Sequence, residues 1–239
     1  MKVPCKPLSD ILDVLKSMTI DTVTIVPTKD GWEFYIRDPS NFMMVSAILK
    51  KDAFEEGEYN PEMEPFAVNY DFIKDSIAKH TSVDLTVENG YVKIAFGNTK
   101  AKKRLYALDG TPRILPKVQL RNSVARTTDK LIELAGKKYW SGAGECELGL
   151  QVDTTEDALT FSFESENEGY VDTYPITLSD MPDGPQTSHF SPAFLLPVLK
   201  ALPKGVAAIF TMETDKPLIV TLTTDAYKID IFIAPRIGD

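Results

Sequence analysis

The chain has 239 residues, enough for one large domain or two of ordinary size, and 43% of them are hydrophobic, which is sufficient for buried cores. Its two cysteines, Cys5 and Cys146, are too few for a disulfide framework and favour a reducing compartment. The net charge of −9 argues against a surface that is positive everywhere but allows a local basic face. The sequence contains no membrane-length apolar run and no signal-peptide pattern, so we expect a soluble protein that is not secreted.

Along the chain, turn signals separate strand-like runs that mostly read as hairpins, and four segments read as helices. The predicted helices span residues 8–17, 70–79, 128–139 and 191–202. We expect the first and third to open with hydroxyl caps, Ser9 and Thr128. Pro197 lies inside the fourth, which therefore either begins late, with Pro197 in its first turn, or is kinked.

The two halves of the chain share one pattern. LTVENGYVKI (85–94) parallels FTMETDKPLI (210–219), DGWEFYI parallels DALTFSF, and the first and third predicted helices match. These ordered correspondences indicate an internal duplication in which each half reads strand, helix, three strands, helix, three strands. We place the domains at residues 1–107 and 121–239, with an extended connector at 108–120 that contains two prolines and a glycine.

Four motifs, spread over the whole chain, carry a family resemblance. They are RDPSNFMMV (37–45), FSPAFLLPVLKAL (190–202), DKPLIV (215–220) and IAPRI (233–237). In order, they resemble the Asp-Pro-Ala/Ser-His/Asn segment, the last helix, the Asp-x-Pro-Leu strand and the C-terminal Leu-Ala-Pro-Arg/Lys-Ile motif of the proliferating cell nuclear antigen (PCNA) family of sliding clamps. The archaeal members are the more similar ones.

The resemblance implies an α+β fold: a duplicated two-domain DNA clamp with antiparallel sheets outside and four helices lining a channel, closed head to tail into a ring of three subunits. It implies a processivity factor that encircles duplex DNA without reading its sequence and tethers DNA polymerase and other replication and repair proteins. The implied partners are a polymerase, a clamp loader, a flap endonuclease and a ligase, which bind through short motifs. No cofactor and no membrane are implied.

Other consequences of the resemblance concern location and assembly. The expected location is the cytoplasm, on the nucleoid, in an archaeon, or the nucleus in a eukaryote. The alternative is a noncatalytic clamp-like subunit that acts as a monomer or within a heterotrimer, because the first helix and the connector diverge from the family pattern.

If the four helices face DNA, basic residues on their solvent sides should contact phosphates, in a salt-dependent way. The candidates are Lys16, Lys74, Lys79, Lys130, Lys137, Lys138, Lys200 and Lys204. The first helix is the weakest, because Asp10 and Asp13 are also expected to point outward. For any one lysine, an ordinary solvated charge is an equally good interpretation.

The basic run KAKKR (100–104) resembles a nucleic-acid patch, but in the family it lies on an edge strand at the subunit boundary, opposite the region that is ESENEGYVD (164–172) here. We favour an interface, because an exposed edge must be paired or blocked and opposite charges select its partner. The predicted interface residues are Lys102, Lys103, Arg104, Leu105, Tyr106, Glu166, Glu168, Tyr170 and Val171.

In the family, client motifs with one aliphatic and two aromatic residues enter a groove between the connector, one loop and the C-terminal tail. Mapped here, its walls are Asn41, Phe42, Met44, Ile114, Leu115, Pro116, Pro217, Phe232, Ala234 and Pro235. For Phe232, a place in the core is at least as good an interpretation.

The sequence offers little support for catalysis. His80 and His189 have no metal-type spacing, and SGAGECELG (141–149) neither follows a strand nor opens a helix, so it reads as a turn. The carboxylates are scattered, which leaves a β-rich hydrolase as a distant alternative. We therefore expect no catalytic residue and no metal site.

Overall fold

The computed structural model describes residues 1–18, 20–108, 115–138, 140, 149–155, 158–164, 169–175, 178–180 (backbone only) and 183–236. The chain divides into two compact units. The N-terminal unit comprises Met1–Ile36, Val45–Leu115 and Thr224–Ile229. The C-terminal unit comprises Arg37–Met44, Pro116–Thr223 and Asp230–Asp239, so each unit includes a segment from the other half of the sequence.

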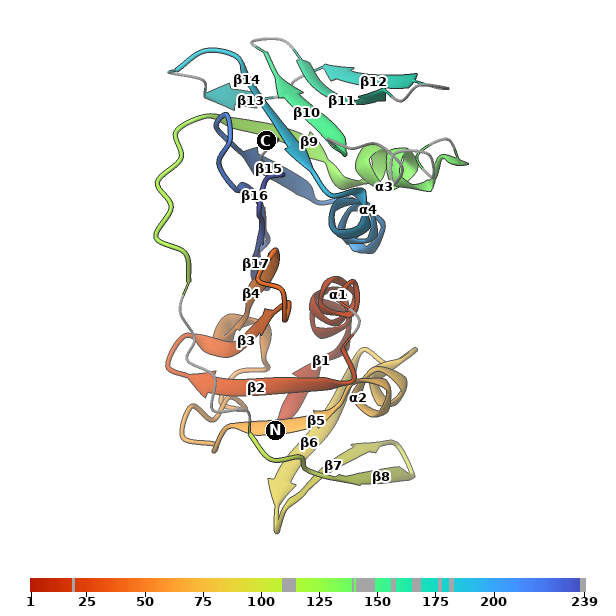
Figure 1. Ribbon diagram of the computed structural model, residues 1–239. Coiled ribbons are helices and arrows are strands. Elements are labelled where there is room, and N and C mark those ends of the chain that lie inside the picture. The colour runs from red at the N-terminus through yellow and green to blue at the C-terminus, as the bar shows by residue number, and fades with distance from the viewer. Residues whose placement is uncertain are drawn as a thin grey trace. The chain divides into compact units, whose positions relative to one another are not determined.

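The N-terminal unit contains two helices, α1 (Cys5–Lys16) and α2 (Tyr70–Ile77), and the short 3-10 helix η1 (Lys51–Ala53). Its strands are β1 (Lys2–Pro4), β2 (Thr22–Thr28), β3 (Gly31–Arg37), β4 (Met43–Lys50), β5 (Phe66–Asn69), β6 (Ser82–Glu88), β7 (Tyr91–Phe96) and β8 (Thr99–Arg104). One antiparallel sheet has the order β1-β6-β7-β8, and β3, β2 and β5 are neighbours in another (Figure 1). β8 is thus an edge strand.

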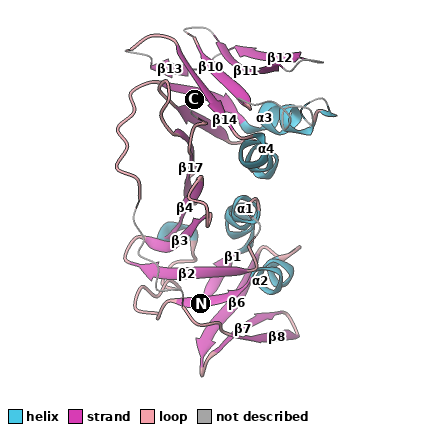
Figure 2. Ribbon diagram, in the orientation of Figure 1, coloured by secondary structure: helices cyan, strands magenta, loops and turns pink. Residues whose placement is uncertain are grey.

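The C-terminal unit contains α3 (Thr128–Gly136) and α4 (Pro192–Ala201), which lie side by side (Figure 1). Its strands are β9 (Ser123–Thr127), β10 (Leu150–Thr154), β11 (Ala158–Glu164), β12 (Gly169–Pro175), β13 (Leu178–Asp180), β14 (Gln186–Phe190), β15 (Ala207–Thr211), β16 (Leu218–Thr223) and the second part of β17 (Tyr227–Ile233). The first residues of β17 belong to the segment Thr224–Ile229 of the N-terminal unit. One antiparallel sheet has the order β12-β11-β10-β14, and β13, β9, β15 and β16 follow one another in a second. Figure 2 shows the predominance of strands in both units, and the predicted α+β class is confirmed.

The two matching hairpins of the duplication are both present. In the N-terminal unit, Asn89 and Gly90 both have positive φ, 51° and 74°, and form the tight turn between β6 and β7. In the C-terminal unit, β15 and β16 pair antiparallel, with Thr211 opposite Ile219 across a longer turn. The predicted hairpins at 85–94 and 210–219 are therefore confirmed.

Several local predictions were wrong. α1 begins at Cys5, because Pro7 is tolerated in a first turn, so Ser9 lies inside the helix instead of capping it. Thr128 is the first residue of α3, and its hydroxyl accepts from the Val206 N–H. Four strands, not three, separate α1 from α2, because the four-residue strand β5 is too short to show a clear alternation.

The fourth helix does not begin late. Ser191 precedes it, its carbonyl accepts from the Leu195 N–H at 3.0 Å, and Pro192 occupies the first position, where a missing N–H costs nothing. Pro197 is consequently an interior residue of α4. The interpretation that placed Pro197 in the first turn is wrong.

The terminal strand β17 is buried on one of its two faces. Tyr227, Ile229, Ile231 and Ile233 are all buried, with at most 3% of each exposed. Phe232 lies on the opposite face of the strand and is half-buried. Phe232 therefore does not belong to the buried face of β17, and its place in the client groove stays a prediction.

Candidate functional site

A tight loop between β3 and β4 presents an aromatic side chain. The Asp38 N–H donates to the Met43 carbonyl, the Asn41 N–H donates to the Asp38 carbonyl, and the Ser40 N–H donates to the Asp38 carboxylate, each at 2.9 Å. Asn41 has a φ of 61°, which suits its short polar side chain. The loop leaves Phe42 with 51% of its surface exposed.

Phe42 lies against Phe194 of α4. The two ring centroids are 5.9 Å apart with the ring planes tilted by 33°, a favourable aromatic geometry. Both residues belong to the C-terminal unit. The sequence did not single out Phe194, because α4 is apolar along most of its length and one aromatic residue within it gives no local signal.

The C-terminal tail is held by backbone contacts on both sides of Pro235. The Ala234 N–H donates to the Phe42 carbonyl at 2.8 Å, Pro235 forms a β-bridge with Phe190, and the Arg236 N–H donates to the His189 carbonyl at 2.8 Å. The tail thus joins the Phe42 loop to the end of β14. We refer to Phe42, Phe194, Ala234 and Pro235 together as the aromatic groove wall, after the client groove that the sequence predicts.

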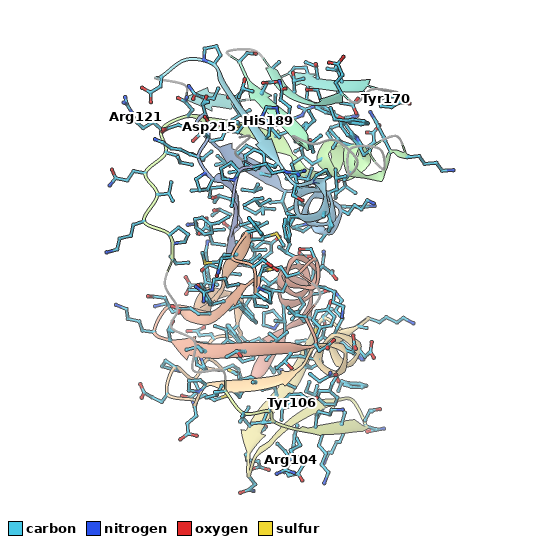
Figure 3. All side chains as sticks on the ribbon, viewed as in Figure 1. Arg104, Tyr106, Arg121, Tyr170, His189 and Asp215 are labelled. Atoms are coloured by element: carbon cyan, nitrogen blue, oxygen red, sulfur yellow. The ribbon has the colours of Figure 1, made fainter. Side chains whose placement is uncertain are left out.

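Both outer sheets end in an exposed edge strand. On β8, Lys100, Lys102, Lys103 and Arg104 are exposed, and the Lys102 ammonium lies 5.4 Å from the centre of the Tyr91 ring. On β12, 68% of Val171 and 37% of Tyr170 are exposed. Figure 3 labels Arg104 at the end of β8 and Tyr170 on β12. One edge is strongly basic and the other carries apolar side chains.

The candidate channel lysines differ in their surroundings. Lys74 is engaged, with its ammonium 2.6 Å from Asp13 and 2.7 Å from the Ser9 hydroxyl. Lys130 pairs with Glu133 at 3.2 Å, and Lys137 of the α3 C-cap pairs with Asp172 at 2.7 Å.

Of the other candidates, Lys16 is also engaged: its ammonium lies 3.9 Å from Asp71, 3.2 Å from the Ile20 carbonyl and 4.6 Å from the centre of the Tyr70 ring. Lys79, Lys200 and Lys204 are exposed and make no ion pair with any described residue. Asp10 does not point outward as expected: only 8% of it is exposed, and it pairs with Lys6 and with the Tyr227 hydroxyl.

No protein-family model matches the sequence, and no curated protein matches it either. Solved structures do match it. The chain superimposes on A. fulgidus PCNA bound to the C-terminal region of FEN-1 with a TM-score of 0.82 and 20% identity, over 100% of this chain and 98% of that chain. PCNA from Thermococcus kodakaraensis gives 0.81 at 17% identity over 98% of both chains. PCNA from Entamoeba histolytica gives 0.81 at 16% identity over 99% and 98%. The chain has the PCNA fold.

The structure brings together four of the predicted groove residues through the loop and tail contacts described above: Asn41, Phe42, Ala234 and Pro235. Met44 is only 8% exposed and offers almost no surface, and Pro217 is half-buried. Of the connector residues, Leu115 is 45% exposed and Pro116 is half-buried, while Ile114 lies outside the described residues.

The structure describes only part of the predicted subunit interface. Lys102, Lys103, Arg104, Tyr170 and Val171 lie on the two exposed edges. Beyond β8, the Leu105 N–H donates to the Gly90 carbonyl in the turn between β6 and β7, and the Tyr106 N–H donates to the Ala67 carbonyl of β5, both at 2.9 Å. Glu166 and Glu168 lie outside the described residues.

Within the described ranges, no three His, Cys, Asp or Glu side chains come together as a metal site would require. Among the helices described, none combines the length and the apolar character needed to cross a membrane.

Proposed function

We propose that this chain is a subunit of a DNA sliding clamp. Three copies would close head to tail into a ring around duplex DNA and act as a processivity factor that performs no chemistry. The observation that carries the proposal is the match to PCNA structures over 98% or more of both chains, which leaves no large region with another role.

The exposed edges support ring closure. Among the described strands, β8 and β12 each lie at the edge of a sheet, and an edge strand needs a partner strand or a block. They are different surfaces, so their pairing is heterologous and closes into a ring when the rotation fits. The basic side chains of β8 suit the acidic residues that precede β12, which include Glu164. Lys102, Lys103, Arg104, Leu105, Tyr106, Glu166, Glu168, Tyr170 and Val171 are the proposed contact residues.

Contact with duplex DNA would come from lysines on or beside the helices. Lys79, Lys200 and Lys204 are the strongest candidates, because they are exposed and make no ion pair with a described residue. Lys16, Lys74, Lys130, Lys137 and Lys138 would contribute more weakly or after exchange of their present partners. A few mobile ammonium groups give weak, salt-dependent binding without sequence preference, which sliding requires.

Client proteins would dock at the aromatic groove wall. Exposed Phe42 and half-buried Phe194 offer ring surfaces, and the tail beside them lies extended, so a short peptide with aromatic residues fits. The FEN-1 C-terminal region bound to A. fulgidus PCNA is consistent with such a client. The proposed clients are a DNA polymerase, a flap endonuclease, a ligase and a clamp loader, in the cytoplasm of an archaeon or the nucleus of a eukaryote.

Size-exclusion chromatography with light scattering tests the assembly. We expect a mass near three times 26.6 kDa, and stimulation of a DNA polymerase on circular primed DNA in the presence of a loader. A trimer that fails to stimulate any tested polymerase on circular DNA would contradict the processivity role.

A second candidate is a clamp-like subunit that acts as a monomer or in a mixed ring. This candidate is supported by the match to the PCNA2–PCNA3 complex from Sulfolobus tokodaii. The TM-score is 0.78 and the identity 17%, over 98% of both chains. A stable mass of 26.6 kDa at high concentration would support this candidate over the homotrimer.

A further inference from the structure

The connector enters the C-terminal unit at one fixed point. Residues 115–120 form no hydrogen bond within the described part of the chain, and Arg121 is the first residue after them that does. The Arg121 N–H donates to Oε1 of Glu213 at 2.9 Å, and its guanidinium pairs with Asp183 at 3.2 Å. The neighbouring Asn122 is 1% exposed and is already part of the core.

Glu213 is held in place by its own turn between β15 and β16. Its second carboxylate oxygen pairs with the Lys216 ammonium, and the Lys216 N–H donates to the Glu213 carbonyl at 3.0 Å. The same carbonyl accepts from the Ser188 hydroxyl at 3.2 Å. Only 13% of the Glu213 side chain is exposed, although its hydrogen bond to the Arg121 amide lies at the surface.

The same turn is tied to the strand that holds the tail. The Ser188 hydroxyl accepts from the Asp215 N–H at 2.9 Å, and Asp215 adopts a φ of 58°. The next residues of β14, His189 and Phe190, contact Arg236 and Pro235 of the tail. Figure 3 labels Arg121, Asp215 and His189, which come from these three segments of the C-terminal unit. The end of the connector and the tail therefore share one hydrogen-bonded support.

We propose that Glu213 is a positioning residue for the connector: by holding the Arg121 amide, it fixes where the segment 115–120 ends and so how that segment meets a client. The hydrogen bond is charge-assisted, since an ionised carboxylate accepts from a backbone N–H. The pKa of Glu213 is lowered by the Lys216 hydrogen bond and then by the Arg121 backbone hydrogen bond, which agrees with an ionised acceptor. Without Glu213, the first core anchor would be Asn122. The consequence for clients depends on the proposed function.

The test compares Glu213→Ala and Glu213→Gln with Glu64→Ala, a matched change at an exposed carboxylate of the N-terminal unit. Amide hydrogen exchange at Arg121 measures directly whether its N–H is held by Glu213. We expect the Arg121 amide to exchange about tenfold faster in Glu213→Ala, less so in Glu213→Gln because an amide oxygen still accepts, and unchanged in Glu64→Ala. Urea unfolding checks that all variants remain folded.

Calorimetry measures the effect on client binding. The probe is a synthetic peptide that carries one aliphatic and two aromatic residues. We expect several-fold weaker binding in Glu213→Ala, about three- to tenfold, and wild-type binding in Glu64→Ala. If the Arg121 amide exchanges at the wild-type rate in Glu213→Ala, Glu213 does not hold the connector. If this amide exchanges faster but the variant binds the peptide with wild-type affinity, Glu213 holds the connector without affecting clients. If the wild type binds no such peptide, the proposed client site fails, and the exchange result alone still decides whether Glu213 holds the connector.

Discussion

The hydroxyl of Tyr227 on β17 donates to Oδ2 of Asp10 on α1 at 3.4 Å, although 217 positions separate the two residues in the chain. Both are buried, with 3% and 8% exposed. The bond ties the first helix to a strand near the end of the sequence, within the same unit. It explains why an acidic residue is tolerated on the buried side of α1.

Tyr227→Phe should lower the free energy of unfolding by about 1 kcal/mol, because Asp10 loses a buried partner while the pair with Lys6 remains. The midpoint of urea unfolding measures the loss. Tyr91→Phe is the control, since its ring is 37% exposed. Equal midpoints for the two variants would show that the Tyr227 hydroxyl contributes nothing.

Tyr70 should make the fold sensitive to alkali. Burial, aided by Asp13, Asp71 and Asp75, raises the pKa of Tyr70 from 10.0 to about 12. Because the folded-state pKa is the higher one, its stabilising contribution is complete below pH 10 and is lost as the pH rises from about 10 to about 12. Between pH 8 and 11, the wild type should lose about 1 kcal/mol more unfolding free energy than Tyr70→Phe. Parallel urea curves for the two proteins across this range would contradict the assignment.

Cys5 should be inert in the folded protein. It is 2% exposed, its thiol lies 3.8 Å from the Val3 carbonyl, and burial raises its pKa from 9.0 to about 11. At pH 8, iodoacetamide should therefore label the Cys5 peptide at least about a hundredfold more slowly in buffer than in concentrated urea, because the thiolate is scarce and shielded. Peptide mapping by mass spectrometry reads Cys5 separately from Cys146. Similar rates in the two conditions would mean that α1 opens readily.

Reversing the charge of the β8 edge should prevent assembly. Changing Lys102, Lys103 and Arg104 to glutamate would place acids opposite the acidic residues that precede β12 in the proposed interface, so we expect monomers by light scattering. Changing the exposed Lys29, Lys51 and Lys117 to glutamate is the control of equal charge and should leave the assembly intact. A ring that survives the first change and loses only its retention on DNA would assign β8 to nucleic acid.

The aromatic groove wall should govern client affinity. Phe42→Ala and Phe194→Ala should each weaken binding of a client-type peptide about tenfold, since each removes one ring of a packed pair. Leu115→Ser and Pro235→Ala test the rest of the predicted groove, and Ile209→Ala, at a residue 37% exposed elsewhere in the unit, should have no effect. Wild-type affinity in both phenylalanine variants would place the clients elsewhere.

The sequence predicted the features that depend on local patterns. The hairpins at 85–94 and 210–219 and the approximate positions of the four helices each depend on a short window of the chain. The order of matching segments was enough to predict the duplication, and the motifs from residue 37 to residue 237 were enough to predict the PCNA fold.

The features that the sequence did not predict depend on distant partners. Asp10 was expected in solvent because its partner Tyr227 lies at the other end of the chain, and Phe194 was overlooked because Phe42 is far from it in sequence. The pairing of Lys74 with Asp13 likewise joins two helices, so neither helix alone shows that this ammonium is already engaged. Tertiary contacts of this kind leave no periodic signal.

The difference between β8 and β12 also determines how successive subunits of an assembly would be oriented. When unlike edges meet, each added copy points the same way as the one before it, so every groove in a closed assembly would open toward one side. A subunit with a blocked β8 could still offer β12 to a neighbour and would end the growth of the assembly at that point. In a mixture with the wild type, such a subunit would therefore terminate assembly. The fraction of incomplete assemblies would rise with the share of the blocked subunit.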